Sequence, residues 1–102
     1  MGRRALPKVD PSLDLTRHLK TFDELPQPWD ATQIFARNAP LEVEVDSGKG
    51  LFVTSAATAR PEHNFLGIKL AKRYAHFAAS RLAKRDLRNA VMVSGDALRV
   101  IH

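Results

Sequence analysis

Cysteine is absent from the 102 residues of this chain, which excludes disulfides, thiolate nucleophiles and cysteine metal ligands. The absence is compatible with a reducing compartment, and we expect a cytoplasmic protein. Long apolar runs are missing as well, because no stretch approaches the roughly 20 apolar residues that a membrane-spanning helix needs. The basic amino-terminal residues are not followed by the apolar segment of a signal peptide. The sequence therefore predicts neither a membrane span nor a signal peptide.

Acidic residues are fewer than basic ones: 11 Asp and Glu stand against 16 Lys and Arg, giving a formal net charge of +5 and a pI near 10.1. This excess favours an anionic partner such as nucleic acid, although modest basicity is also common on solvated surfaces. The histidines lack metal-ligand spacing, so we interpret them as scattered solvated side chains and predict no metal site. They are His18, His63, His76 and His102.

Residues 1–29 contain four prolines and many charges but no sustained helical or strand period. We interpret them as an extended arm that would not fold alone, and residues 30–102 as one truncated Rossmann-like half-domain. Basic side chains of the arm either contact RNA phosphates without sequence preference or are simply solvated. These side chains are Arg3, Arg4, Lys8, Arg17 and Lys20.

Residues 41–45 alternate apolar and acidic side chains, which predicts a strand, and short apolar segments predict two more at 64–69 and 90–94. Small and apolar residues between them predict helices at 49–59 and 70–85. Such alternation with tight connections is typical of a parallel sheet with right-handed crossovers. The predicted fold is therefore α/β, a partial Rossmann-like fold of three parallel strands with flanking helices.

The sequence also predicts a further short helix and indicates which face of the helix at 70–85 is apolar. Asp30 is a plausible N-cap for a short helix at 31–37, which Asn38 and Pro40 would end. The helix at 70–85 has one apolar face, predicted to hold Leu70, Tyr74, Phe77, Ala78 and Leu82. Its other face is either solvated or a surface for RNA. That face carries Lys72, Arg73, Arg81, Lys84 and Arg85.

A glycine turn, Gly48-Lys49-Gly50, follows the first predicted strand and precedes a helix. Such a turn lets a ligand approach the backbone, and the helix offers unpaired N–H groups to a negative group. Glycines also serve tight strand-to-helix connections for purely structural reasons. The turn thus indicates a cofactor site only together with the wider sequence.

That wider sequence resembles the amino-terminal half of the bacterial tRNA (guanine-N7)-methyltransferases. The resemblance covers about residues 30–101 and is carried by residues 35–50, 60–68, 87–89 and 95–97. It implies S-adenosylmethionine as cofactor, tRNA as partner and methyl transfer to a tRNA guanine as the activity.

The resemblance also implies roles for individual residues. Glu44 matches an acidic residue beside the methionine end of the cofactor, where a carboxylate can accept hydrogen bonds from a cationic group. Gly48 and Gly50 match the turn glycines. Asp96 and Ala97 match the pair that meets the adenine, and Asp96 is equally suited to cap a helix that begins at Ala97.

Two positions depart from the family pattern. Asp46 stands where the family has the first turn glycine, and Lys69 stands where it has an acidic residue that holds the ribose hydroxyls. Each change is expected to weaken cofactor binding, because a lysine has no acceptor and Asp46 adds a carboxylate. We expect Asp46 and Lys69 to form a partly exposed ion pair, whereas in a competing hypothesis Lys69 favours a phosphate-bearing ligand.

The resemblance implies that catalysis needs residues beyond the third strand, and this chain stops at His102. We predict no catalytic residue here and expect the isolated chain to be inactive. In the family's sheet the first strand is central, so residues 41–45 would form an open edge and favour a homo-oligomer. The alternative function is a non-enzymatic, self-assembling βαβ scaffold with a disabled cofactor site.

Overall fold

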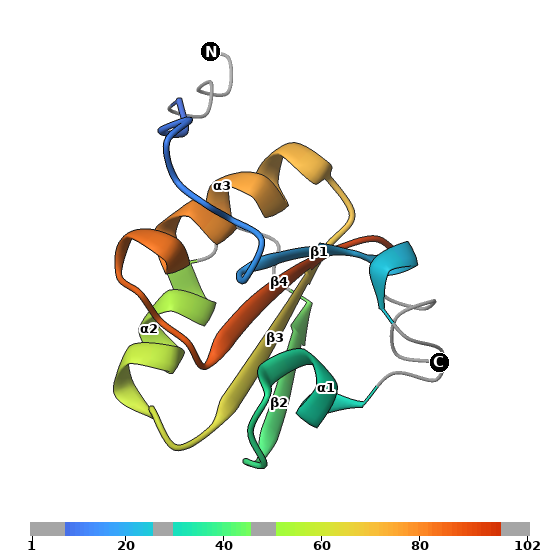
Figure 1. Cartoon of the computed structure of the whole chain (residues 1–102), viewed down its shortest axis with the longest axis vertical. Helices are drawn as coiled ribbons and strands as arrows, with labels where there is room; N and C mark the ends of the chain where they lie inside the picture. The colour runs from blue at the N-terminus through green and yellow to red at the C-terminus, as the bar shows by residue number, and fades with distance from the viewer. Residues whose placement is uncertain (1–7, 26–29, 46–50, 97–102) are drawn as a thin grey trace.

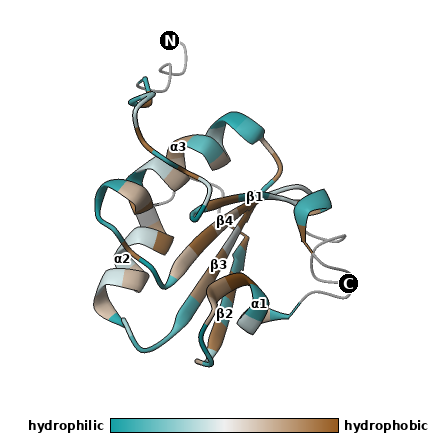
Figure 2. Cartoon of the chain, in the orientation of Figure 1, coloured by the Kyte–Doolittle hydropathy of each residue, from teal (hydrophilic) through white to brown (hydrophobic). Residues whose placement is uncertain are grey.

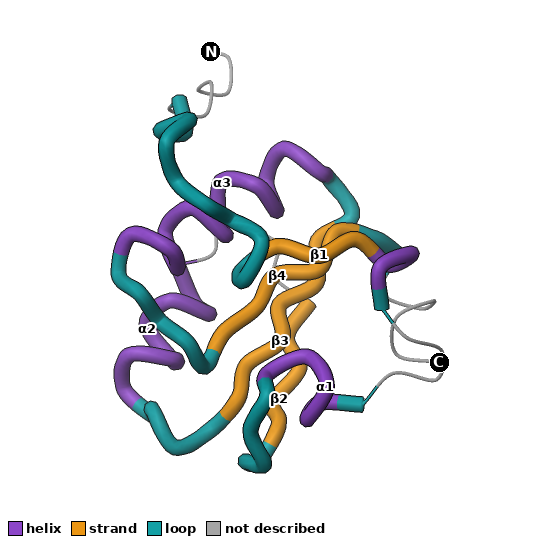
Figure 3. Tube along the Cα trace, viewed as in Figure 1, coloured by secondary structure: helices purple, strands orange, loops and turns teal. Residues whose placement is uncertain are grey.

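The computed structural model describes residues 8–25, 30–45 and 51–96, and every structural statement below concerns these residues. Parallel strands and helices alternate along the chain (Figures 1 and 3). The strands are β1 (Leu19–Thr21), β2 (Leu41–Val45), β3 (Asn64–Lys69) and β4 (Ala90–Ser94). The helices are α1 (Ala31–Phe35), α2 (Leu51–Ala59), α3 (Lys72–Lys84) and a short 3-10 turn at Phe22–Glu24.

The four strands form one parallel sheet in the order β1-β4-β3-β2. One face packs against α2 and α3, where Val53, Leu82 and the strand residues Phe65 and Met92 share a core. A second core lies on the opposite face and includes Phe35 of α1. Hydrophobic residues concentrate along the two inner strands, β3 and β4 (Figure 2). The sheet is therefore covered on both faces, as expected of a parallel sheet.

The predicted α/β class is confirmed, and each of the three predicted strands has the predicted bounds. Asp30 caps α1 as expected, because its carboxylate accepts a hydrogen bond from the Thr32 amide at 2.7 Å. The helix ends at Phe35, earlier than predicted, since Ala36 adopts a left-handed conformation with φ of 55°. The sheet also has a fourth strand that the sequence did not predict.

That fourth strand, β1, lies within the predicted extended arm. The expectation of an arm without a strand is wrong for Leu19–Thr21, which pair in parallel with Met92 to Ser94 of β4. The amide of Met92 also donates to the His18 carbonyl at 2.8 Å, and Leu25 is buried in the second core. Three residues are too few to show a period, so pairing with β4 rather than local pattern makes this strand.

The apolar face of α3 differs in part from the prediction. Leu70 is 78% exposed and precedes the helix, which begins at Lys72. Phe77, Ala78 and Leu82 are buried as predicted. Alanines complete the buried face, since α3 approaches the sheet closely enough that small side chains fill the interface.

His18 is a buried histidine, not the solvated side chain that the sequence predicts. Its Nε2 lies 2.9 Å from the Leu87 carbonyl, which can only accept, so Nε2 carries the proton. Within the described residues Nδ1 has no hydrogen-bond partner. Burial lowers the pKa of His18 from 6.5, Arg17 lowers it further, and the Leu87 bond and Asp86 oppose these effects.

This lowered pKa predicts that the fold loses stability on mild acidification. Because the unfolded chain binds a proton near pH 6.5 and the folded chain only at lower pH, unfolding takes up a proton as pH falls. Thermal unfolding of the wild type should therefore shift to lower temperature between pH 7.5 and 5. His18→Gln, which retains an N–H donor but does not titrate, should flatten that dependence. The exposed His76 supplies the control, since His76→Gln should leave it unchanged; equal slopes for all three proteins would contradict the prediction.

Candidate functional site

The candidate site lies where three neighbouring strands end. In the register of the sheet Glu44 lies opposite Gly67, and Lys69 lies opposite Ser94. The amide of Gly95 donates to the Lys69 carbonyl at 2.8 Å, which continues the pairing of β3 and β4 past the last strand residue. Ligands of open parallel α/β sheets bind at such carboxyl edges. The topology thus brings three predicted site positions, 44, 69 and 96, to one edge of the sheet.

The remaining predicted site residues are Asp46, Gly48, Gly50 and Ala97, and they lie outside the described residues. The proposed ion pair of Asp46 with Lys69 is therefore still a prediction. Lys69 is only 4% exposed, so the expectation of a partly exposed pair is wrong on its side. The cause is the position of β3 between β2 and β4, with Lys69 on the side of the sheet that α2 and α3 cover. A buried pair carries a desolvation cost that an exposed pair avoids.

The side chains at this edge fit a cofactor only in part. Glu44 is half-buried and Asp96 is exposed, and both carboxylates can accept hydrogen bonds from amino groups. Lys69 has three donors and no acceptor, so it does not suit the hydroxyls of a ribose. Two of the three positions therefore suit S-adenosylmethionine, whereas Lys69 does not.

Gly67 keeps the covered face of this edge tightly packed. A Cβ at this position would lie 2.7 Å from Sδ and 2.9 Å from Cε of Met92, and 3.1 Å from Cγ2 of Val53. Both neighbours are fully buried. The absence of a side chain at Gly67 thus lets α2 pack directly on β3 beside the candidate site.

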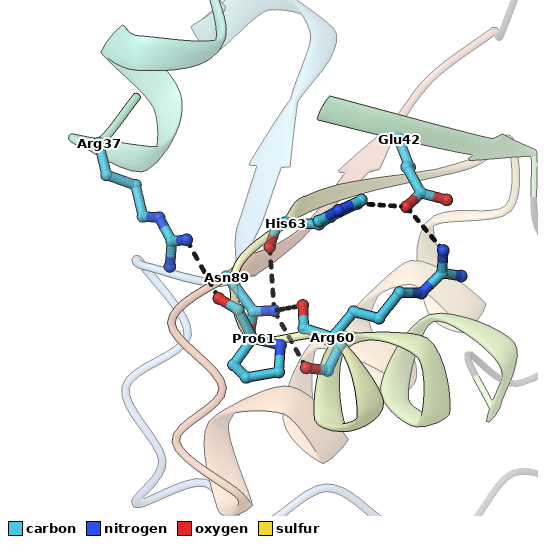
Figure 4. A network of polar contacts seen from close by, with 7 residues as sticks. Arg37, Glu42, Arg60, Pro61, His63 and Asn89 are labelled. Carbon is cyan, nitrogen blue, oxygen red and sulfur yellow. Dashed lines mark hydrogen bonds and ion pairs between the residues drawn. The ribbon is translucent and has the colours of Figure 1, made fainter. Parts of the chain in front are cut away.

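A polar network lies at the amino-terminal ends of the strands, opposite the candidate site (Figure 4). Glu42 accepts from Arg60 at 3.1 Å and from His63 at 2.7 Å. Arg60 also lies over the Phe65 ring, with its Cζ 5.5 Å from the ring centroid. Arg37 donates to the Pro61 carbonyl at 3.1 Å. These contacts join β2 and the segment between α1 and β2 to the connection between α2 and β3.

Asn89 is the buried centre of this network. Its Nδ2 lies 3.0 Å from the carbonyl of Ala57, 3.2 Å from that of Arg60 and 3.1 Å from that of His63. The two N–H donors of this amide are thus shared among three carbonyls at the end of α2 and in the following turn (Figure 4). The sequence alone does not predict this role of Asn89, because its partners come from a segment distant in the sequence.

The described residues contain neither a cluster of metal ligands nor a membrane-spanning helix. Residues 8–25, 30–45 and 51–96 contain no cluster of three or more His, Cys, Asp or Glu side chains that could hold a metal ion. None of the helices within these ranges has the length and apolar character needed to span a bilayer.

Three curated proteins similar to this chain carry the name tRNA (guanine-N(7)-)-methyltransferase. The protein from Rhodopirellula baltica is 50% identical over 97 residues, which cover 95% of this chain and 36% of the relative. That from Oceanobacillus iheyensis is 34% identical over 98% of this chain and 47% of the relative. That from Oenococcus oeni is 32% identical over 90% of this chain and 42% of the relative. The chain thus spans less than half the length of each.

Family comparison agrees with these similarities and with the parallel α/β fold. The model of the Methyltransf_4 family, described as "Putative methyltransferase", matches residues 38–102. This range begins just before β2 and includes β3, β4 and the carboxyl edge at which positions 44, 69 and 96 meet. Because the family model matches more than half of the chain, the chain belongs to this methyltransferase family.

Proposed function

We propose that this chain forms the S-adenosylmethionine-binding part of a cytoplasmic tRNA (guanine-N7)-methyltransferase. The observation that carries the proposal is the meeting of positions 44, 69 and 96 at one carboxyl edge, within the range that the family model matches. The names of the similar proteins support tRNA as the partner.

The cofactor would supply the methyl group from its sulfonium. Glu44 would accept a hydrogen bond from the amino group of its methionine part, and Asp96 one from the adenine amine. Gly48 and Gly50 would admit the cofactor beside the backbone, and Ala97 would lie against the adenine. No residue of this chain is assigned a catalytic role, and we expect the isolated chain to be inactive.

Calorimetric titration of S-adenosylmethionine tests this assignment. We expect the chain as it stands to bind weakly, and the double variant Asp46→Gly, Lys69→Glu to bind at least about tenfold tighter. Each reversion restores an interaction worth on the order of 1–3 kcal/mol, and 1.4 kcal/mol is tenfold in affinity. Lys72→Glu is the control for the charge reversal at Lys69, because Lys72 is exposed at the start of α3. Absence of binding by every variant, with the fold intact by circular dichroism, would contradict the proposal.

The second candidate function is self-assembly of a βαβ scaffold through β2, with a second copy of the chain as the partner. Among the described strands β2 lies at an edge, and its Val43 and Val45 are 38% and 62% exposed. An open strand edge with apolar side chains favours pairing with another chain. Light scattering on the samples used for titration separates the two functions. A dimer without cofactor binding would support assembly, and a monomer at high micromolar concentration would exclude it.

A further inference from the structure

A basic cavity lies between the beginning of the described chain and the carboxyl-terminal half of α3. Its volume is about 290 Å³. It is lined by Lys8, Phe77, Ser80, Arg81, Lys84 and Arg85. Because α3 leads into the amino-terminal end of β4, this cavity lies away from the carboxyl edge at which Lys69 and Asp96 are found. It is therefore separate from the candidate cofactor site.

The charge of this cavity is uniformly positive among the described residues that line it: four are cations and none is an acid. The carboxylate of Asp10 accepts hydrogen bonds from the Ser12 amide and hydroxyl at 2.9 and 2.8 Å, which lower its pKa, and the charge of Lys84 lowers it further. Cations gathered in a hollow raise the local potential and attract anions. The cavity thus offers a site for a negatively charged ligand.

Arg81 is held in a fixed position in this cavity. Its Cζ lies 5.2 Å from the centroid of the Phe77 ring, a cation–π contact with a side chain that is itself buried. The Phe77 carbonyl in turn accepts from the Ser80 hydroxyl at 2.6 Å. Arg81 Nε is buried and has no hydrogen-bond partner in the described residues. The contact with the Phe77 ring thus orients the guanidinium in advance, which reduces the entropy lost on binding.

Two other cavities are less suited to an anion. One, of about 260 Å³, has only Arg17 and Arg88 as cations, beside apolar residues of α1 and β4. The other, of about 270 Å³, includes Asp86, whose carboxylate lies 3.6 Å from Arg88. Of these three cavities among the described residues, the one at the end of α3 therefore suits an anionic ligand best.

We propose that the cavity at the end of α3 binds a backbone phosphate of RNA. Arg81 would present its oriented guanidinium to the phosphate oxygens, and Lys8, Lys84 and Arg85 would supply the surrounding positive charge. A phosphodiester carries no base identity, so the site would position RNA without reading its sequence. The choice of RNA as the ligand rests on the proposed function, whereas the cavity itself rests on geometry and charge.

Binding of a fluorescently labelled, unmodified tRNA transcript, followed by anisotropy at several KCl concentrations, tests this site. The double variant Lys84→Gln, Arg85→Gln should weaken binding about tenfold near 0.1 M salt. It should also reduce the slope of log K against log salt by up to about 1, since the cavity holds one phosphate and each phosphate contact contributes nearly one unit. Lys72→Gln, Arg73→Gln is the matched control, because it removes the same charge from exposed positions at the other end of the same helix. It should change affinity less than about twofold.

Arg81→Lys tests whether binding depends on the oriented guanidinium or only on the positive charge of the surface. This variant keeps the charge but loses the planar group over Phe77, so we expect a loss of about threefold in affinity with little change in salt slope. Equal losses for the two double variants, or an unchanged affinity for Arg81→Lys, would overturn the proposal, as would absence of binding by the wild type. Titration with S-adenosylmethionine tests the carboxyl edge of the sheet, and tRNA anisotropy tests the cavity at the end of α3. Failure of the proposed function can therefore be distinguished from failure of the RNA site.

Discussion

Replacing Gly67 with alanine is expected to lower the free energy of unfolding by about 2 kcal/mol. Without a steric conflict the sign would be the reverse, because alanine restricts the unfolded chain and stabilises a strand by roughly 0.4–1 kcal/mol. Here the new methyl group would lie within 2.9 Å of two Met92 atoms and 3.1 Å from Val53. Guanidinium-induced unfolding followed by circular dichroism measures the change.

The thioether of Met92 is flexible, but the side chain is fully buried, so any shift must displace its neighbours. A double-mutant cycle with Met92→Ala tests this cause, since removing Sδ and Cε opens the space that the Gly67→Ala methyl needs. We expect the double variant to be more stable than the sum of the single changes predicts. Strict additivity, or a stabilising Gly67→Ala, would show that the close approach of α2 to β3 does not constrain this position.

Replacing Asn89 with aspartate should be more damaging, with a loss of about 3 kcal/mol or more. The substitution preserves shape but removes the donor that three carbonyls share, and it places a carboxylate against their oxygens. Asn38→Asp is the matched control, because Asn38 is exposed and should tolerate the same chemical change. Chemical unfolding at pH 7 measures both.

Acidification offers a second readout for Asn89→Asp. A protonated carboxyl regains one O–H donor, so the deficit relative to the wild type should shrink as the pH approaches 4. Asn89→Ala, which lacks both the donor and the charge, should show a smaller loss at neutral pH that does not recover. If Asn89→Asp were as stable as Asn38→Asp, the network around the end of α2 would not contribute to folding.

The sequence predicts the strands whose pattern of apolar and polar residues is typical of a strand. β2 alternates apolar and acidic residues, and β3 and β4 are apolar runs bounded by turns, so their bounds follow from the sequence. β1 has no such pattern, because Leu19–Thr21 is short and is defined by pairing with residues far along the chain. The burial of His18 has the same origin, since its partner is the Leu87 carbonyl.

The sequence predicts only part of the candidate site. A parallel sheet brings the ends of its strands together, so the common edge of Glu44 and Lys69 is predictable from strand positions alone. The burial of Lys69 is not, because the end of a strand can be open or covered depending on how helices from elsewhere pack. The cavity at the end of α3 likewise requires the arm to lie against the helix, and only its basic side chains are visible in the sequence.

The strand order β1-β4-β3-β2 also determines when the sheet can form. β4 is the last of the four strands to leave the ribosome, yet it lies between the first strand and the third. Until residues 90–94 have been synthesised, β1 has no neighbour and β3 has one free side. The order of synthesis of these four strands therefore differs from their order in the sheet, and a growing chain leaves the edges of β1 and β3 unpaired until β4 inserts between them.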